Sequence, residues 1–141
     1  MAQINSPQDN SFVVYVLGVV FNPETRKILI GKCAENPHFP ELSWGFPGGK
    51  PSNEEEFEES LKKEIKVSTG LDVENLGAVF AKRYPDAKKV MAVYYLCEAT
   101  GGEEKPGGEM SELKWVNPEE IEKHFTTSFH PHLKEYILNL K

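Results

Sequence analysis

Cysteine is scarce in this sequence, since Cys33 and Cys97 are the only two among 141 residues. Two thiols so far apart provide neither a zinc knuckle nor a disulfide framework, so we expect reduced, buried thiols of an intracellular protein. Long apolar runs are also missing, because the longest, residues 12–21, is far shorter than the roughly 20 residues that cross a bilayer. Residues 1–10 are polar and lack the basic flank and apolar run of a signal peptide. We therefore expect a cytoplasmic protein that makes no membrane contact.

Positive charge is in deficit. The chain has 16 Lys and Arg against 22 Asp and Glu, which gives a formal net charge of −6 at pH 7. This charge repels a phosphate backbone and argues against general nucleic-acid binding, so any phosphate site must be local. The chain is 39% hydrophobic and 27% charged, which is the composition of an ordinary globular protein. Its length predicts a single domain over residues 1–141, with a flexible N-terminus over residues 1–10.

The order of hydrophobic patterns predicts strands around one central helix. Five segments have strand-like composition, in two antiparallel pairs and one short final strand: 12–21 with 27–33, 76–84 with 90–98, and 113–116. Residues 44–51 hold too many Gly and Pro residues for regular structure, so we expect a shaped loop there. Two helices are predicted near the C-terminal end of the sequence. One is short and begins at Pro118, directly after Asn117, and the other covers residues 132–140. The fold class is therefore α/β (α+β), with a single mixed sheet between helices.

The clearest helix is predicted over residues 52–69. Phe57, Leu61 and Ile65 recur every fourth residue and form its apolar stripe, so all three are expected to be buried against the sheet. Gly70 stands where a left-handed C-terminal cap is needed. Two residue pairs at the start match a capping box: Ser52 with Glu55, and Asn53 with Glu56.

The Gly-rich loop leads directly into this helix. Gly48 and Gly49 let the backbone approach a ligand closely, and the free N–H groups of the helix start could hold a phosphate. The alternative is a tight turn before a solvated helix, which the spacing alone does not exclude.

Residues 49–71 resemble the signature of the Nudix hydrolases, G-x5-E-x7-R-E-U-x-E-E-x-G-U, in which U is apolar. Six positions match without a gap, and Lys63 stands in place of Arg; the matching residues are Gly49, Glu55, Glu64, Ile65, Gly70 and Leu71. Residues 44–49 are similar to the family's approach to this motif, and residues 109–121 are similar to the way many members close their sheet. The resemblance implies an α/β/α sandwich with a central mixed β-sheet. It also implies a hydrolase of a diphosphate linkage in a nucleoside diphosphate derivative, with Mg²⁺ or Mn²⁺ bound by carboxylates of the motif.

The sequence departs from the motif at Val67 and Ser68, where the family has two glutamates. Residues i, i+3 and i+4 of a helix share one face, so Glu64, Val67 and Ser68 are expected where three carboxylates would converge. Because one carboxylate attracts a hard cation weakly, we expect weak metal binding. The resemblance implies that Glu64 is a metal ligand and the catalytic residue that orients or deprotonates water. Glu109 or Glu112 could replace a missing ligand, because in the family a Glu outside the motif often adds one.

The residues implied in phosphate binding or in shaping the loop are Gly48, Gly49, Lys50, Glu55 and Lys63. Glu55 could instead only cap the helix, and Lys63 could pair with Glu59 four residues earlier.

Two other functions stay open. The first is a nucleotide-binding or regulatory module that has kept the fold and lost the chemistry, and the Val67–Ser68 pair is the feature that bears on it. The second is a structural domain without a ligand, which the paired glycines disfavour.

Overall fold

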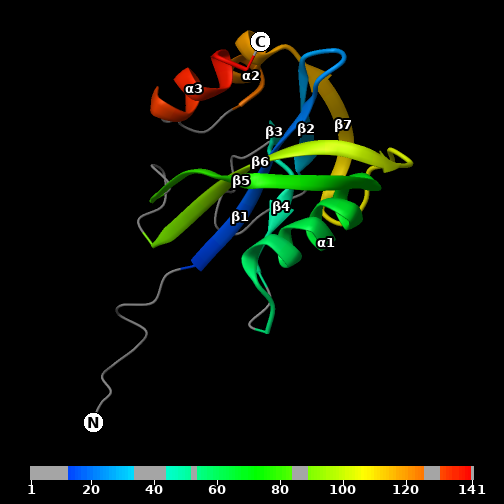
Figure 1. Cartoon of the computed structure of the whole chain (residues 1–141), viewed down its shortest axis with the longest axis vertical. Helices are drawn as coiled ribbons and strands as arrows, with labels where there is room; N and C mark the ends of the chain where they lie inside the picture. The colour runs from blue at the N-terminus through cyan, green and yellow to red at the C-terminus, as the bar shows by residue number, and fades with distance from the viewer. Residues whose placement is uncertain (1–12, 34–43, 52–53, 84–88, 126–130, 141) are drawn as a thin grey trace.

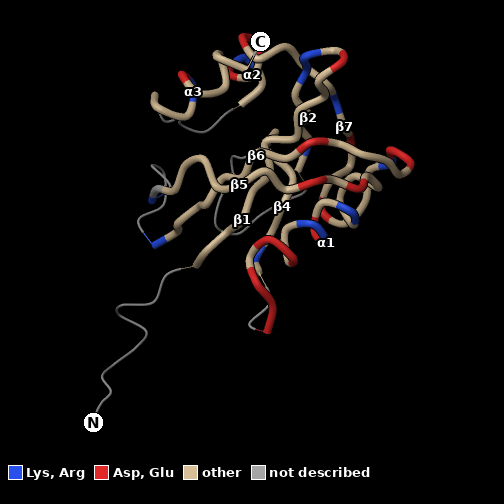
Figure 2. Tube along the Cα trace, in the orientation of Figure 1, with Lys and Arg blue, Asp and Glu red and all other residues tan. Residues whose placement is uncertain are grey.

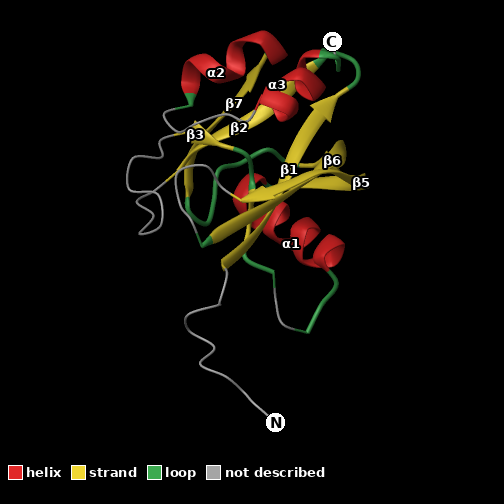
Figure 3. Ribbon diagram, turned by 90° about the vertical axis from the view of Figure 1, so that its left-hand side faces the viewer, coloured by secondary structure: helices red, strands yellow, loops and turns green. Residues whose placement is uncertain are grey.

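The computed structural model describes residues 13–33, 44–51, 54–83, 89–125 and 131–140. In these residues a mixed β-sheet lies between helix α1 on one face and helices α2 and α3 on the other (Figures 1 and 3). The expected mixed sheet between helices is therefore confirmed. The N-terminal segment that we expected to be flexible lies outside the described residues.

Strands β1 (Val13–Asn22) and β2 (Lys27–Cys33) form the expected antiparallel hairpin. The side chain of Asn22 shapes the turn, because its Oδ1 accepts hydrogen bonds from the backbone N–H groups of Glu24 and Thr25 at 2.9 and 3.3 Å. A polar turn between two strongly apolar strands thus sets where the chain reverses.

The second antiparallel pair consists of β5 (Leu71–Arg83) and β6 (Val90–Gly102). Strand β6 also runs parallel to β1 over its first nine residue pairs, which joins the two hairpins into one sheet. Strand β5 begins five residues before the expected Leu76. Leu71 and Val73 are buried and alternate with exposed residues, so the strand pattern starts directly after Gly70.

Two very short strands fill the space between β1 and β2. Strands β1 and β2 pair with each other at three positions next to their turn. Farther from the turn, β2 pairs with β3 (Trp44–Gly45), and β1 pairs with β4 (Gly48–Gly49). The expectation of no regular structure here is wrong for these four residues. A Cβ on Gly48 would lie 2.0 Å from the Val16 carbonyl oxygen, and its φ is +150°, so glycine is what allows β4 to pair so closely.

The final strand, β7 (Met110–Val116), pairs with the free edge of β2 and is three residues longer than expected. A 3-10 turn (Pro118–Glu120), α2 (Ile121–His124) and α3 (Pro131–Leu138) follow. Glu120 Oε1 accepts a hydrogen bond from the Asn117 N–H at 3.3 Å, which fixes the start of the expected short helix.

Helix α1 (Phe57–Thr69) begins later than expected, with Glu56 as its N-cap residue and no side-chain cap. Ser52 and Asn53, on which the capping-box predictions depended, lie outside the described residues. Leu61 and Ile65 are fully buried, as expected, but Phe57 is 39% exposed. The prediction for Phe57 is wrong because this residue opens the helix, whereas the buried positions of α1 begin at Ser60.

Each face of the sheet has its own core. The core under α1 contains mainly residues from β1, α1, β5 and β6: Val16, Val20, Leu29, Leu61, Ile65, Leu71, Val73, Tyr95 and Cys97. The opposite core contains residues that α2 and α3 cover: Val19, Ile28, Ile30, Phe46, Ala92, Tyr94, Val116, Ile121, Leu133 and Ile137. Both cysteines are free thiols, with Cys97 buried and Cys33 half-buried. None of the described helices is both long and apolar enough to cross a membrane.

Candidate functional site

Helix α1 brings Glu64 against strand β4. A Cβ added to Gly49 would lie 2.8 Å from Glu64 Oε1 and 3.3 Å from its Cγ. Gly49 is held in place by pairing with Val16 of β1, and Glu64 by the buried Ile65 beside it. The carboxylate therefore occupies the volume that any other residue at position 49 would fill with its side chain.

Glu109 lies in the turn that precedes β7, two residues after Gly107, whose N–H donates to the Ser68 carbonyl oxygen of α1 at 3.0 Å. Burial is the larger cause that raises the pKa of Glu64, and the negative charge of Glu109 is the second. The same two causes, burial and then Glu109, raise the pKa of the Cys33 thiol to about 11. The negative charge of Glu109 therefore reaches both Glu64 and Cys33, and a bound cation would relieve the repulsion between the two carboxylates.

Glu112 lies on the opposite face of the sheet. Leu113 and Trp115 of β7 pack in the core under α1, whereas Val116 packs in the core under α2 and α3. Alternation along the strand places Glu112 and Lys114 on the same face as Val116, away from Glu64. Of the two replacement ligands that the sequence suggested, only Glu109 is near Glu64.

Glu55 and Lys63 form an ion pair with each other. The hydrogen bond and the charge of Glu55 raise the pKa of Lys63, and Glu59 contributes least. Ser60 Oγ also donates to Glu55 Oε1 at 3.5 Å. Helix α1 has Glu56 as its N-cap residue with no side-chain cap, and the Ser52 partner that the capping alternative for Glu55 requires lies outside the described residues.

Acidic residues gather on the segment that leads into α1 (Figure 2). Lys50 is exposed directly after β4, and Gly48 pairs with Leu17 inside the sheet. The phosphate candidates therefore divide into two groups: Gly48, Gly49 and Lys50 lie in or beside β4, whereas Glu55 and Lys63 bind each other.

Val67 and Ser68 differ in exposure although both lie near Glu64 on the helix. Val67 is 59% exposed, and Ser68 is only 6% exposed. The Ser68 hydroxyl donates a hydrogen bond to the Glu64 carbonyl oxygen at 2.8 Å, so its proton is engaged by the helix backbone. Neither residue adds negative charge to the site.

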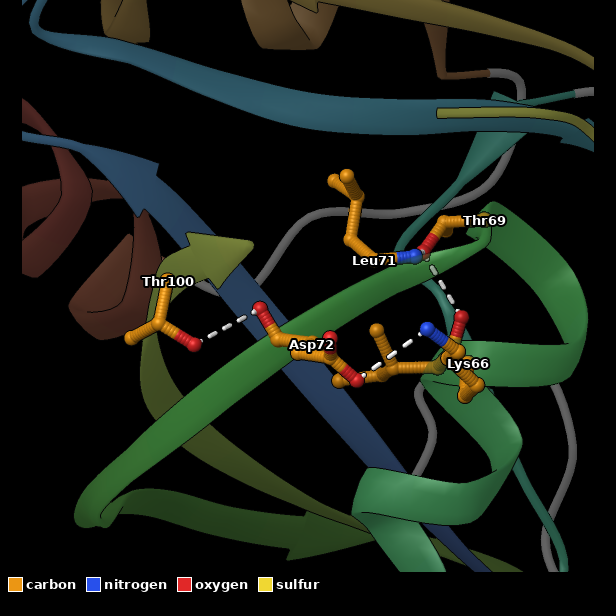
Figure 4. Close-up of polar contacts among 6 residues, drawn as sticks. Lys66, Thr69, Leu71, Asp72 and Thr100 are labelled. Carbon is orange, nitrogen blue, oxygen red and sulfur yellow. Dashed lines mark hydrogen bonds and ion pairs between the residues drawn. The ribbon is translucent and has the colours of Figure 1, made fainter. Parts of the chain in front are cut away.

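The end of α1 is anchored to β5 by side-chain contacts (Figure 4). The Thr69 hydroxyl donates to the Ile65 carbonyl oxygen at 2.7 Å and accepts from the Leu71 N–H at 3.1 Å. Lys66 Nζ lies 3.1 Å from Asp72 Oδ1. These contacts fix the helix that carries Glu64 to the sheet.

Within the described part of the chain, no group of three or more His, Cys, Asp or Glu residues is arranged to hold a metal ion. Glu64 and Glu109 nevertheless offer two carboxylates. Mg²⁺ in phosphate-handling sites is commonly held by one or two carboxylates, with water and substrate phosphates as its other ligands. The donor set fits that mode of binding, and it does not fit a metal cage made by the protein alone.

Sequence reasoning missed what places Glu109 here. The sequence predicts only a loop of Gly, Glu, Lys and Pro over residues 100–108. In the structure β6 continues to Gly102, and the segment after it lies along the C-terminal end of α1, with hydrogen bonds from Lys105 N–H to the Thr69 carbonyl and from Gly107 N–H to the Ser68 carbonyl. The adjacent Gly107 and Gly108 were the available signal, since paired glycines often mark a close backbone approach.

Comparison with known proteins identifies the family and the fold. The family model of the NUDIX domain matches residues 11–137. A MutT-like protein from Streptomyces ambofaciens is 27% identical over 110 residues; the match covers 77% of this chain and 66% of that relative, so the chain spans about two thirds of its length.

Solved structures show the same fold. The MutT protein from Methanosarcina mazei Go1 matches with a TM-score of 0.72 and 20% identity, covering 98% of this chain and 96% of that chain. The NUDIX domain of Shewanella oneidensis NrtR, solved in complex with ADP ribose, matches with a TM-score of 0.68 and 22% identity, covering 93% and 90%.

Proposed function

Because the chain belongs to the NUDIX domain family, we propose that it hydrolyses the diphosphate linkage of a small nucleoside diphosphate derivative. The observation that carries this proposal is the Glu64 carboxylate, which lies against Gly49 with Glu109 beside it. Glu64 is a charged group on a rigid helix that is anchored to the sheet, and it lies against the Gly-rich strand β4.

In the proposed reaction, the oxygen of water attacks one phosphorus and the bridging P–O bond breaks, so two phosphate monoesters form. Glu64 orients the water and accepts its proton. Mg²⁺ or Mn²⁺, held by Glu64 and Glu109 when bound, would neutralise charge on the diphosphate. Gly48, Gly49 and Lys50 would face the phosphates.

The proposed substrate class is a small-molecule nucleotide rather than a nucleic acid. The net charge of −6 disfavours a polyanionic partner, while a local site with one exposed lysine can still receive a single diphosphate. The ADP ribose bound by the NrtR domain makes ADP-ribose the first compound to test.

The second candidate function is a binding or regulatory module without hydrolysis. It is favoured by Val67 and Ser68, because Ser68 is buried and its hydroxyl proton is committed to the helix backbone. Such a chain would bind the same nucleotides and leave them intact.

A hydrolysis assay separates the two functions. We expect the wild-type chain with Mg²⁺ or Mn²⁺ to convert ADP-ribose to AMP and ribose 5-phosphate, and Glu64→Gln to be slower by about 100-fold or more, as for loss of a general base. Glu112→Gln is the matched control, because this glutamate lies on the other face of the sheet and should retain full activity. Binding of ADP-ribose without turnover in the wild type would favour the binding module instead.

A further inference from the structure

The segment between β6 and β7 caps the C-terminal end of α1 with its backbone. Lys105 N–H donates to the Thr69 carbonyl oxygen at 2.8 Å, and Gly107 N–H donates to the Ser68 carbonyl oxygen at 3.0 Å. Carbonyl groups in the last turn of a helix have no partner within the helix, so these two bonds satisfy groups that would otherwise need water. The segment therefore has a fixed place on the helix.

Glycine is required for this approach. A Cβ on Gly107 would lie 2.4 Å from the Val67 carbonyl oxygen, a backbone atom that cannot move without shifting the helix. Gly108 has a φ of +55°, and its Cβ would lie 3.1 Å from Val67 Cγ1. Residues 107–110, which we call the docked turn, thus lie against Val67 and Ser68, with no space for a side chain at 107 and with a backbone conformation at 108 that favours glycine.

Glu109 is held inside the docked turn. Met110 N–H donates to the Gly107 carbonyl oxygen at 2.9 Å and closes the turn, and Met110 is buried at the start of β7. Glu109 is therefore fixed on both sides, by the glycines at α1 and by the strand. The turn reaches α1 at Ser68, whose hydroxyl donates to the Glu64 carbonyl oxygen one helical turn earlier, so Glu109 lies on the side of α1 that carries Glu64. The negative charge of Glu109 accordingly raises the pKa of Glu64 and of the Cys33 thiol.

We propose that the docked turn is a positioning element that holds Glu109 next to Glu64, and that Val67 and Ser68 are its seat on the helix. The two positions that lack carboxylates thus support the second carboxylate through packing and backbone hydrogen bonds. A glutamate at position 67 would add a negative charge beside the turn and repel Glu109, whereas valine packs against Gly108. This inference rests on the proposed metal-dependent function, because it explains how Glu109 is positioned as a metal ligand.

The docking itself is tested without any ligand. Gly107→Ala should release the turn, so amide hydrogen exchange at positions 105 and 107 should become faster, because their N–H groups lose the helix carbonyls as acceptors. Gly101→Ala is the matched control: its added Cβ would meet only Asp72 Oδ2, at 3.8 Å, so the protection of both amides should be unchanged. Fast exchange of both amides in the wild type would overturn the proposal.

The positioning role is tested by binding of Mn²⁺ alone, measured by electron paramagnetic resonance in a double-mutant cycle. Glu109→Gln and Gly107→Ala should each weaken Mn²⁺ binding by about 10-fold or more, the range seen when the support of a metal ligand is lost. The combined variant should be no weaker than Glu109→Gln, because both changes remove the same ligand. Gly101→Ala should bind like the wild type.

The outcomes are distinct. Mn²⁺ binding that depends on Glu64 and Glu109 but not on Gly107 would overturn the positioning role and leave the proposed function intact. Wild-type Mn²⁺ binding that is unchanged in Glu64→Gln would overturn the proposed metal site, and the positioning role with it.

Discussion

Glu64 is placed where its charge is costly to the folded chain. Its side chain is half-buried, lies against Gly49 and faces the charge of Glu109, and burial and that charge both raise its pKa. Residues in functional sites often lower the stability of the folded protein in this way, because an arrangement of charges that binds a ligand is unfavourable when the ligand is absent.

Replacing Glu64 by Gln should therefore stabilise the metal-free protein at neutral pH. The pKa of Glu64 is higher in the folded than in the unfolded chain, so protonation of this group favours the folded state. This contribution to the free energy of unfolding is lost as the pH rises through the folded pKa. The wild type loses this contribution as Glu64 ionises, whereas Gln carries no charge at any pH. The gain should thus disappear below the ordinary glutamate pKa of about 4.3.

Urea unfolding of the wild type and Glu64→Gln, at pH 7 and at a pH below that value, measures this difference. Glu112→Gln, an exposed change on the opposite face, controls for the loss of one negative charge. An equal gain at both pH values would show that the effect does not come from the ionised carboxylate.

Individual residues also mark the limit of prediction from the sequence. The motif identified Gly49 and Glu64 as site residues, and the structure adds that they lie against each other. The choice between Glu109 and Glu112 did not follow, because it depends on the pairing of β7 with β2, which includes a register shift at Lys32 and Cys33. A one-residue change in register reverses the face of every side chain, and the sequence of β7 alone does not specify it.

At the level of elements, the junction from α1 to β5 depends on Thr69. This residue is fully buried, and its hydroxyl bridges the Ile65 carbonyl and the Leu71 N–H. We expect Thr69→Val, which preserves shape and removes the hydroxyl, to lower the free energy of unfolding by about 1–3 kcal/mol, the cost of leaving a buried polar group without its partner.

Thermal or urea unfolding checks this expectation. Thr69→Ser keeps the hydroxyl and should retain more stability than Thr69→Val. If Val is as stable as the wild type, the hydroxyl bridge does not hold this junction together.

The elements differ in how well the sequence predicted them. Gly70 has a φ of 78° and ends α1 where the sequence predicted, because glycine adopts the left-handed conformation of a helix C-cap without steric cost. The start of α1 was predicted too early, because several polar residues before Phe57 are compatible with a first helical turn. The two strands β3 and β4 were missed, since glycines form strands here only because the edges of β1 and β2 are available to pair with them.

At the scale of the whole molecule, the sheet brings two segments that are far apart in the sequence to one site. The Gly-rich segment pairs with β1, the segment after β6 caps α1, and Glu64 lies between them. The layered fold could be predicted from the order of patterns, whereas this convergence could not, because it depends on contacts between segments far apart in the chain.

The most direct test of the proposed site is the thermal stability of the whole chain with Mn²⁺, with the α,β-methylene analogue of ADP, and with both together. Because two carboxylates leave most metal ligands to water and phosphate, we expect metal and analogue together to raise the Tm by more than the sum of their separate shifts. This synergy should be absent in Glu64→Gln and retained in Glu112→Gln. Additive shifts in the wild type, or a synergy that persists in Glu64→Gln, would contradict a site in which Glu64 holds a metal together with a diphosphate.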